Sequence, residues 1–141
     1  LDIGHELNAT TISCLDLSDL ILLVTTPDIP SLCNTKAILQ TFKKLGYTED
    51  KVKLILNRWH MKGEIDTALA EKNISYSIFH KLEEDASLAI NSLNQGVPIS
   101  ELSKNAGLVK SFDKLAKLVS ETVKKGELAH GAPRTVKANG S

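Results

Sequence analysis

The feature that most constrains the fold is a continuous apolar run at residues 20–26, with the sequence LILLVTT. The run is too short for a typical helix, but its length suits a strand. A strand that is apolar along its whole length, without polar alternation, is normally buried on both faces. That environment occurs in parallel sheets whose two faces are covered by helices. The run therefore predicts a parallel α/β arrangement.

Segments with helical spacing separate this run from two further predicted strands. Directly after the run, PDIPS favours a helix start, because Pro30 suits a first turn and Asp28 or Ser31 can cap it. Gly46 stands where such a helix is expected to end. The other expected elements are strands at 52–56 and 74–79, and helices at 64–72, 84–95 and 104–125.

The order strand, helix, strand, helix, strand, helix, helix is typical of a sheet built by right-handed crossovers. Three to four strands make a narrow sheet, whereas a doubly wound domain usually has about five or more. We therefore predict that residues 1–126 form the C-terminal half of a doubly wound, mostly parallel sheet. Such a half would expose a sheet edge and apolar surface, a route to dimerisation or swapping. Residues 127–141 lose all periodicity and predict a disordered tail.

The composition is that of an ordinary globular protein and argues against several classes. Acidic and basic residues balance at 17 each, so no overall field attracts nucleic acid or an anionic membrane. No apolar run reaches the roughly 18 residues of a membrane span, and the start is too polar for a signal peptide. Cys14 and Cys33 lack nearby histidines. We favour two reduced thiols in a cytoplasmic protein, while a disulfide stays open.

Polar side chains gather where the predicted strands end. In open α/β sheets, ligands bind outside the carboxyl ends of the strands. These places hold Asp2 near the start of the chain, TTPD at 25–28, Asn57 with Arg58, and LEED at 82–85. The carboxyl ends of parallel strands share one edge of the sheet. A single site there is therefore the first functional hypothesis.

Each candidate also has a structural interpretation. Asn57 offers donors and an acceptor, which match the edge of an adenine ring, but it can equally cap backbone groups at a strand end. Arg58 can stack on a base or pair with an acid. Asp85 is well placed for the dipole of a following helix, and Asp2 alone is uninterpretable. The chain has no glycine-rich phosphate loop, no nucleophile elbow and no histidine pair at ligand spacing.

Taken in order, these segments resemble one family. LDIGHEL, TTPDIPSL, ILNR followed by KGEI, and AINSLNQGVP are similar to successive parts of the C-terminal half of MinD/ParA-type P-loop ATPases, over about residues 1–120. Each phrase is loose by itself, whereas their order and spacing together are specific. Within that family the chain looks most like the CpaE/TadZ branch, which serves pilus assembly and its polar placement.

The resemblance implies roles for individual residues. Asp2 matches the aspartate that ends a strand, begins switch II and binds the magnesium of the nucleotide through water. Gly4 falls where the family often has proline or glycine in switch II. Asn57 and Arg58 match the family's Asn-Arg pair, in which the asparagine reads adenine. These matches imply that ATP and Mg²⁺ are the cofactors of the full-length protein.

The resemblance also has two departures. Residues 82–85 fall on the family's Ile-Pro-x-Asp loop, which packs against the base. Asp85 matches its aspartate, but Glu83 replaces its proline. The family's phosphate loop, Lys-Gly-Gly-x-Gly-Lys-Ser/Thr, belongs far upstream of Asp2 and does not occur in this chain. Because that loop performs most of the phosphate binding, we expect the chain alone to bind ATP weakly and not to hydrolyse it.

The functional hypothesis is therefore part of an ATPase that positions or assembles a pilus or secretion apparatus through nucleotide-dependent homodimerisation. Its expected location is cytoplasmic, either polar or at the membrane through its partners. A non-catalytic localisation scaffold of the same fold is the first alternative, towards which Glu83 leans slightly. A ParA-type DNA-partition ATPase is the second, and the neutral charge argues against it.

Overall fold

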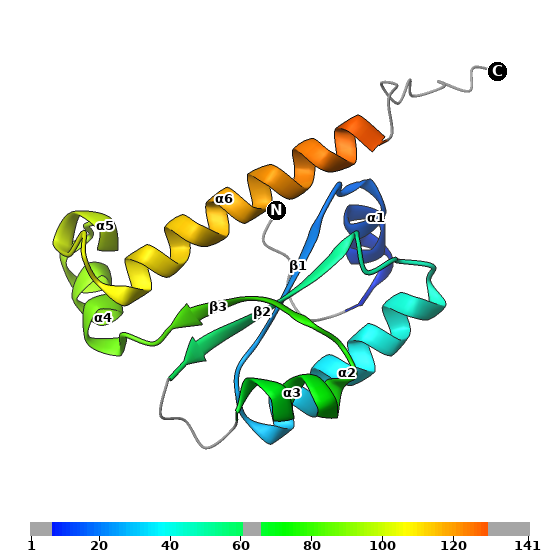
Figure 1. The fold of residues 1–141 in the computed structure, drawn as a ribbon, viewed down its shortest axis with the longest axis horizontal. Helices are drawn as coiled ribbons and strands as arrows, with labels where there is room; N and C mark the ends of the chain where they lie inside the picture. Colours follow the sequence, from blue (N-terminus) through cyan, green and yellow to red (C-terminus); the bar gives the residue numbers. More distant parts are fainter. Residues whose placement is uncertain (1–6, 61–65, 130–141) are drawn as a thin grey trace.

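Three parallel strands form one sheet in the computed structural model, which describes residues 7–60 and 66–129 (Figure 1). The central strand β2 (Val52–Trp59) pairs with β1 (Ile21–Thr25) on one side and with β3 (Ile78–Glu83) on the other. The strand order β1-β2-β3 follows the chain order. The predicted parallel α/β class is confirmed.

Helices lie on both sides of the sheet (Figure 1). α2 (Ile29–Lys44) and α3 (Thr67–Ile74) pack together on one side, while α6 (Gly107–Ala129) lies on the other side against β3. The remaining helices are α1 (Ala9–Leu17) before β1, and α4 (Ala86–Gln95) and α5 (Ile99–Leu102) after β3. Helices thus lie on both faces of the described sheet, as in doubly wound folds.

The core lies where β2 meets α2 and α3. Leu54 is fully buried and belongs to one cluster with side chains from both helices, such as Phe42 and Ile74. Its neighbour Ile55, on the opposite face of the strand, is also buried. Burying one such side chain stabilises the fold by about 1.5–3 kcal/mol. The continuous apolar character of β2 is therefore explained by burial on both faces.

The sequence predicted burial on both faces for residues 20–26, and this prediction is wrong, because β1 is buried on one face only. Ile21 and Thr25 are buried, whereas Leu22 is 39% exposed and Val24 is 56% exposed. The reason is that β1 is an edge strand in the described structure and that α6 packs against β3. The exposed apolar surface is the one that the half-domain hypothesis expected.

The start and end of α2 follow the predicted signals. Asp28 is the N-cap residue, and its Oδ1 accepts a hydrogen bond from the backbone N–H of Ser31 at 2.9 Å. Pro30 lies in the first turn, where its missing N–H costs nothing. Gly46 follows the helix with a φ of 85°, a left-handed conformation that glycine adopts without strain.

The third strand was predicted at 74–79 but lies at Ile78–Glu83. Ile74 instead ends α3 as a buried residue, and Ser75 caps that helix in a left-handed conformation. The hydroxyl of Tyr76 donates to the carbonyl of Val52 at 2.9 Å, so its apolar ring fills a position beside β2. The true strand contains charged residues, which an edge strand accommodates.

Several helices also differ from the prediction, among them α3, which was expected at 64–72 and lies at Thr67–Ile74. α1 was not expected, because its sequence ATTISCLDL is rich in β-branched residues, but Asn8 caps it by accepting a bond from Thr11 N–H at 2.9 Å. The short helix α5 replaces part of a predicted turn. α6 continues to Ala129, past the predicted domain end at 126. Residues 130–141, the rest of the predicted tail, lie outside the described residues.

A tyrosine joins α1 to the loop between α2 and β2. The hydroxyl of Tyr47 donates to Asp16 Oδ1 at 2.6 Å, and its ring meets Phe42 edge-on at 5.4 Å. Lys51 lies over the other side of that ring, 5.0 Å from its centre, and donates to the carbonyl of Asp16 at 3.0 Å. Partial burial and the Asp16 carboxylate raise the pKa of Tyr47 to about 12.

This pKa predicts a stability change at alkaline pH. The neutral hydroxyl is favoured in the folded state, so the contribution of Tyr47 is complete below its ordinary pKa of 10.0 and is lost as the pH rises towards about 12. We expect the free energy of unfolding to fall more steeply over that range in the wild type than in Tyr47→Phe. Urea titrations at several pH values measure it. Parallel curves for the two proteins would contradict the assignment.

Candidate functional site

The carboxyl ends of all three strands meet at one edge of the sheet. Thr25, the last residue of β1, lies opposite Leu56 of β2, and Trp59 of β2 lies opposite Glu83 of β3. The Asn57–Arg58 pair and the 83–85 stretch are therefore on neighbouring strand ends. The structure brings these predicted site residues together across β2 and β3.

Asn57 and Arg58 form a bulge in the last part of β2. The side-chain oxygen of Asn57 accepts the backbone N–H of Arg58 at 2.9 Å. Arg58 adopts a φ of 54°, a left-handed conformation that costs a non-glycine residue about 1–2 kcal/mol. The pairing with β3 is irregular between Leu56 and Trp59, where these two residues lie. Asn57 therefore does cap backbone, as the structural interpretation proposed.

That role leaves part of the Asn57 side chain for a ligand. An amide oxygen has two lone pairs, and only one is used by Arg58 N–H. Among the described residues, nothing accepts a hydrogen bond from the amide NH₂ of Asn57. The side chain is half-buried, and Arg58 is exposed. One donor and one acceptor thus remain side by side, the pattern that an adenine edge requires.

The loop after β3 is tied to the end of β2. The backbone N–H of Glu84 donates to the carbonyl of Trp59 at 3.1 Å. The side chains of Glu84 and His60 meet as well, with 3.5 Å between Oε2 and Nε2. These contacts hold the 83–85 stretch beside the Asn57–Arg58 bulge, although Glu84 itself was not among the predicted ligand contacts.

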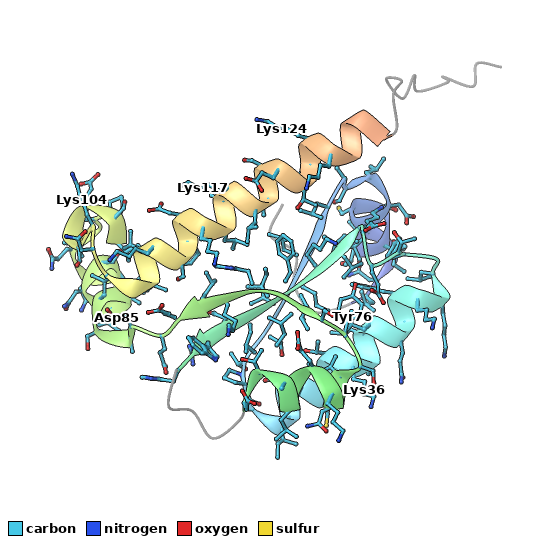
Figure 2. All side chains as sticks on the ribbon, in the orientation of Figure 1. Lys36, Tyr76, Asp85, Lys104, Lys117 and Lys124 are labelled. Atoms are coloured by element: carbon cyan, nitrogen blue, oxygen red, sulfur yellow. The ribbon has the colours of Figure 1, made fainter. Side chains whose placement is uncertain are left out.

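Asp85 is the N-cap residue of α4, which Figure 2 places beyond the end of β3. Its Oδ1 accepts the backbone N–H of Leu88 at 2.9 Å. A cap of this kind stabilises a helix by about 0.5–2 kcal/mol. The structural interpretation of Asp85 is therefore realised, and one carboxylate oxygen is engaged by the helix.

Glu83, which stands in place of the family's proline, has a structural partner that the sequence did not reveal. Its carboxylate lies against Gly107, the first residue of α6, and leaves no room for a Cβ on Gly107. The positive end of the helix dipole favours a carboxylate there. Its backbone N–H also donates to Ser111 Oγ at 3.3 Å. Glu83 thus connects β3 to the start of α6.

Hydroxyl groups surround the strand end at TTPD. The hydroxyl of Thr26 donates to the Asp28 carboxylate and lies 2.9 Å from the hydroxyl of Ser31. The hydrogen bond from Thr26 lowers the pKa of Asp28 below its ordinary value, and the bond from the Ser31 N–H lowers it further. The buried hydroxyl of Thr35 donates to Thr25 Oγ1 at 2.8 Å. Through these bonds the polar groups satisfy one another's hydrogen-bonding capacity, and together they fix the turn between β1 and α2.

The residues predicted for the magnesium side of the site lie outside the part of the chain that the structure describes. Asp2 and Gly4 lie outside the described residues, so their predicted roles stay predictions. Over residues 7–60 and 66–129, no group of three or more His, Cys, Asp or Glu side chains is arranged to hold a metal ion. Cys14 and Cys33 are both free thiols.

The contact between Glu83 and Gly107 predicts energetic coupling. In Gly107→Ala the new methyl group displaces the Glu83 carboxylate, so the substitution is more destabilising in the wild type than in a Glu83→Ala background, by only about 0.5 kcal/mol, because the displaced group is the end of an exposed, flexible side chain. Chemical denaturation of the four proteins in the cycle measures this difference. Gly126→Ala is the control, because a Cβ there meets nothing within 4 Å. Equal effects in both backgrounds would disprove the contact.

Comparisons with known proteins show what this chain is similar to. No protein-family model matches the chain. The septum site-determining protein MinD of Thermotoga maritima is 30% identical over 104 residues, which cover 70% of this chain and 38% of that protein. The chain therefore spans well under half the length of this curated relative.

Solved structures have the same fold. A ParA family ATPase from Chlorobium tepidum TLS superimposes with a TM-score of 0.69 at 22% identity, over 84% of this chain and 47% of that one. MinD of Pyrococcus horikoshii OT3, solved in complex with Mg-ADP, gives 0.66 at 23% identity, over 86% and 49%. The sequence match and these folds lead to one conclusion: the chain is similar in sequence to part of MinD and has the fold of the corresponding part of MinD and ParA family ATPases.

Proposed function

We propose that this chain forms the adenine side of an ATPase domain, whose phosphate side is supplied by another part of the same protein. The observation that carries the proposal is that the Asn57–Arg58 bulge and the 83–85 stretch lie on neighbouring strands at the carboxyl edge of β2 and β3. Ligands of open α/β sheets bind at that edge. A solved relative with Mg-ADP supports the choice of nucleotide.

In this proposal the described residues bind and orient the base. The amide of Asn57 offers its NH₂ group and its second lone pair to the adenine edge. Arg58 is exposed beside it, where a planar guanidinium can stack on the ring. The 83–85 stretch, held by Trp59 and His60, forms the adjoining wall. ATP with Mg²⁺ supplies the phosphoryl chemistry, and Asp2 would bind the magnesium through water.

The exposed face of β1 supports the idea of a divided domain. Leu22 and Val24 lie on an edge strand, on the face opposite the buried Ile21 and Thr25. Exposed apolar side chains on an unpaired edge favour association with further strands. We propose that the phosphate-binding part of the domain pairs with β1 and covers this face.

For the cellular role, we propose nucleotide-dependent homodimerisation in the service of a pilus or secretion apparatus. The resemblance to the CpaE/TadZ branch supports this choice. The described helices include none with the length and apolar character of a membrane span, so membrane association in this proposal occurs through partners. Glu83 gives the scaffold alternative little support. Its carboxylate is directed against Gly107, so its presence in place of proline has a structural explanation.

The first test uses the 141-residue chain itself. We expect isothermal titration calorimetry with Mg-ATP to show no binding at micromolar concentrations, because the phosphate groups of a nucleotide need a loop that this chain does not contain. The chain should also release no phosphate from ATP. A micromolar Kd for this chain would overturn the proposal that the phosphate side lies elsewhere.

The second test concerns base recognition in a protein that includes the phosphate-binding part. Asn57→Ala should weaken ATP binding by about 1–3 kcal/mol, the cost of losing a buried hydrogen-bonding partner, and should reduce the preference for ATP over GTP. Asn73→Ala, at the end of α3, is the matched control. Fluorescent-nucleotide competition gives both affinities. An unchanged ATP/GTP ratio in Asn57→Ala would remove Asn57 from the site.

A further inference from the structure

The outer edge of β3 forms the floor of an open groove. In the described structure, β3 is hydrogen-bonded to one neighbour only, β2. A space of about 630 Å³ contacts four consecutive residues, Ile78 to Lys81, together with α6 on one side and Thr67 of α3 on the other. Consecutive strand residues point to opposite faces, so a space that touches all four must run along the edge. We name it the β3 edge groove.

Side chains engage the backbone at the two ends of this edge, and in its middle His80 Nε2 lies 2.8 Å from the carbonyl of Ser111 on α6. The backbone N–H of Ile78 donates to Glu71 Oε1 at 2.7 Å, and that of Glu83 donates to Ser111 Oγ at 3.3 Å. An edge strand between such stops presents main-chain donors and acceptors that can pair with an incoming strand. The groove therefore has room for a short extended segment.

The side chains that line the groove give it a positive charge. Lys110 and Lys114 lie one turn apart on α6, both exposed, and neither is paired with a described residue. Lys81 lines the opposite side, where it lies 4.2 Å over the ring of Trp59. The acid in the lining is Glu83, whose carboxylate is directed against Gly107. This local excess of lysine occurs in a chain whose total charge is zero.

The charge also selects the occupant. The last twelve residues of the chain, 130–141, contain Arg134 and Lys137 but no acid, so electrostatics disfavour them in this groove. A second copy of the chain carries no net charge to attract it. An acidic segment from another protein is the complementary partner.

We propose that the β3 edge groove binds an extended acidic peptide of a partner protein by strand addition. Alternate residues of an added strand face opposite sides. Acidic side chains on one side meet Lys110 and Lys114, while apolar side chains on the other contact the region of Trp59. Main-chain bonds to β3 supply affinity, and the lysines supply charge selection. The proposal uses none of Asn57, Arg58 or Asp85, although the groove shares Trp59 and Glu83 with the wall of the proposed nucleotide site.

The test uses the 141-residue chain and a short, blocked peptide that alternates Glu and Val. Trp59 is the single tryptophan of the chain and lines the groove, so its fluorescence reports binding directly. We expect a saturable change with a Kd below about 1 mM that weakens with added salt. A peptide alternating Lys and Val should not bind. A Glu-Val peptide N-methylated at alternate residues should also fail, because it cannot pair with an edge strand.

Matched charge reversals locate the site. Lys110→Glu with Lys114→Glu should weaken the peptide by at least about tenfold. Lys117→Glu with Lys124→Glu changes the net charge equally on the same helix but outside the groove, and should change the Kd less than about twofold (Figure 2). Circular dichroism verifies folding, and Lys110→Gln with Lys114→Gln serves if the reversed pair misfolds.

Four results would overturn the proposal. Equal weakening by the two reversals would mean general charge attraction. Undiminished binding of the N-methylated peptide would exclude strand addition. Absence of saturable peptide binding would exclude the groove as a peptide site, and binding of anionic phospholipid vesicles with the same dependence on Lys110 and Lys114 would assign these lysines to a membrane surface instead.

Discussion

The burial of β2 is the constraint on which the rest of this structure depends. Because Leu54, Ile55 and Leu56 are buried on successive faces, the strand must have helices above and below it and a paired strand on each side. Parallel pairing then forces every connection to cross over the sheet, which places α2 and α3 on their side. The same pairing aligns the carboxyl ends of the strands. The candidate site is thus a consequence of how β2 is buried.

Local signals in the sequence were sufficient for some elements and misleading for others. α2 was predictable because its cap Asp28 and Pro30 act within a few residues. The predicted position of β3 was wrong because Ile74 and Tyr76 alternate with polar residues, as in a strand. Ile74 instead ends α3, and the hydroxyl of Tyr76 bonds to the carbonyl of Val52. The burial of β1 depends on which elements cover it, a property of the whole fold. Periodicity carries no information about such distant coverage.

The site shows the same division between local and distant causes. Asn57 and Asp85 could be predicted as candidates because strand ends and helix starts are local features, and each has a structural bond as well as open polar atoms. The role of Glu83 was not predictable, since its partner Gly107 is far away in the sequence. A residue that departs from a family pattern can therefore have a packing reason, and its departure is weak evidence for lost activity.

The order of the sheet has a consequence for how the chain acquires its structure. Each strand pairs with the next strand in the sequence, so the sheet grows by one crossover unit at a time. Each crossover contains one helix, so the strands that pair are close in the sequence and the entropy of closure is modest. Tyr76 and Lys36 reinforce this stepwise arrangement, because each bonds across one neighbouring element, to Val52 and Asn73 (Figure 2). A boundary drawn between two strands of such a sheet leaves every completed unit intact, which allows evolution or proteolysis to divide the domain there without undoing the pairing already made.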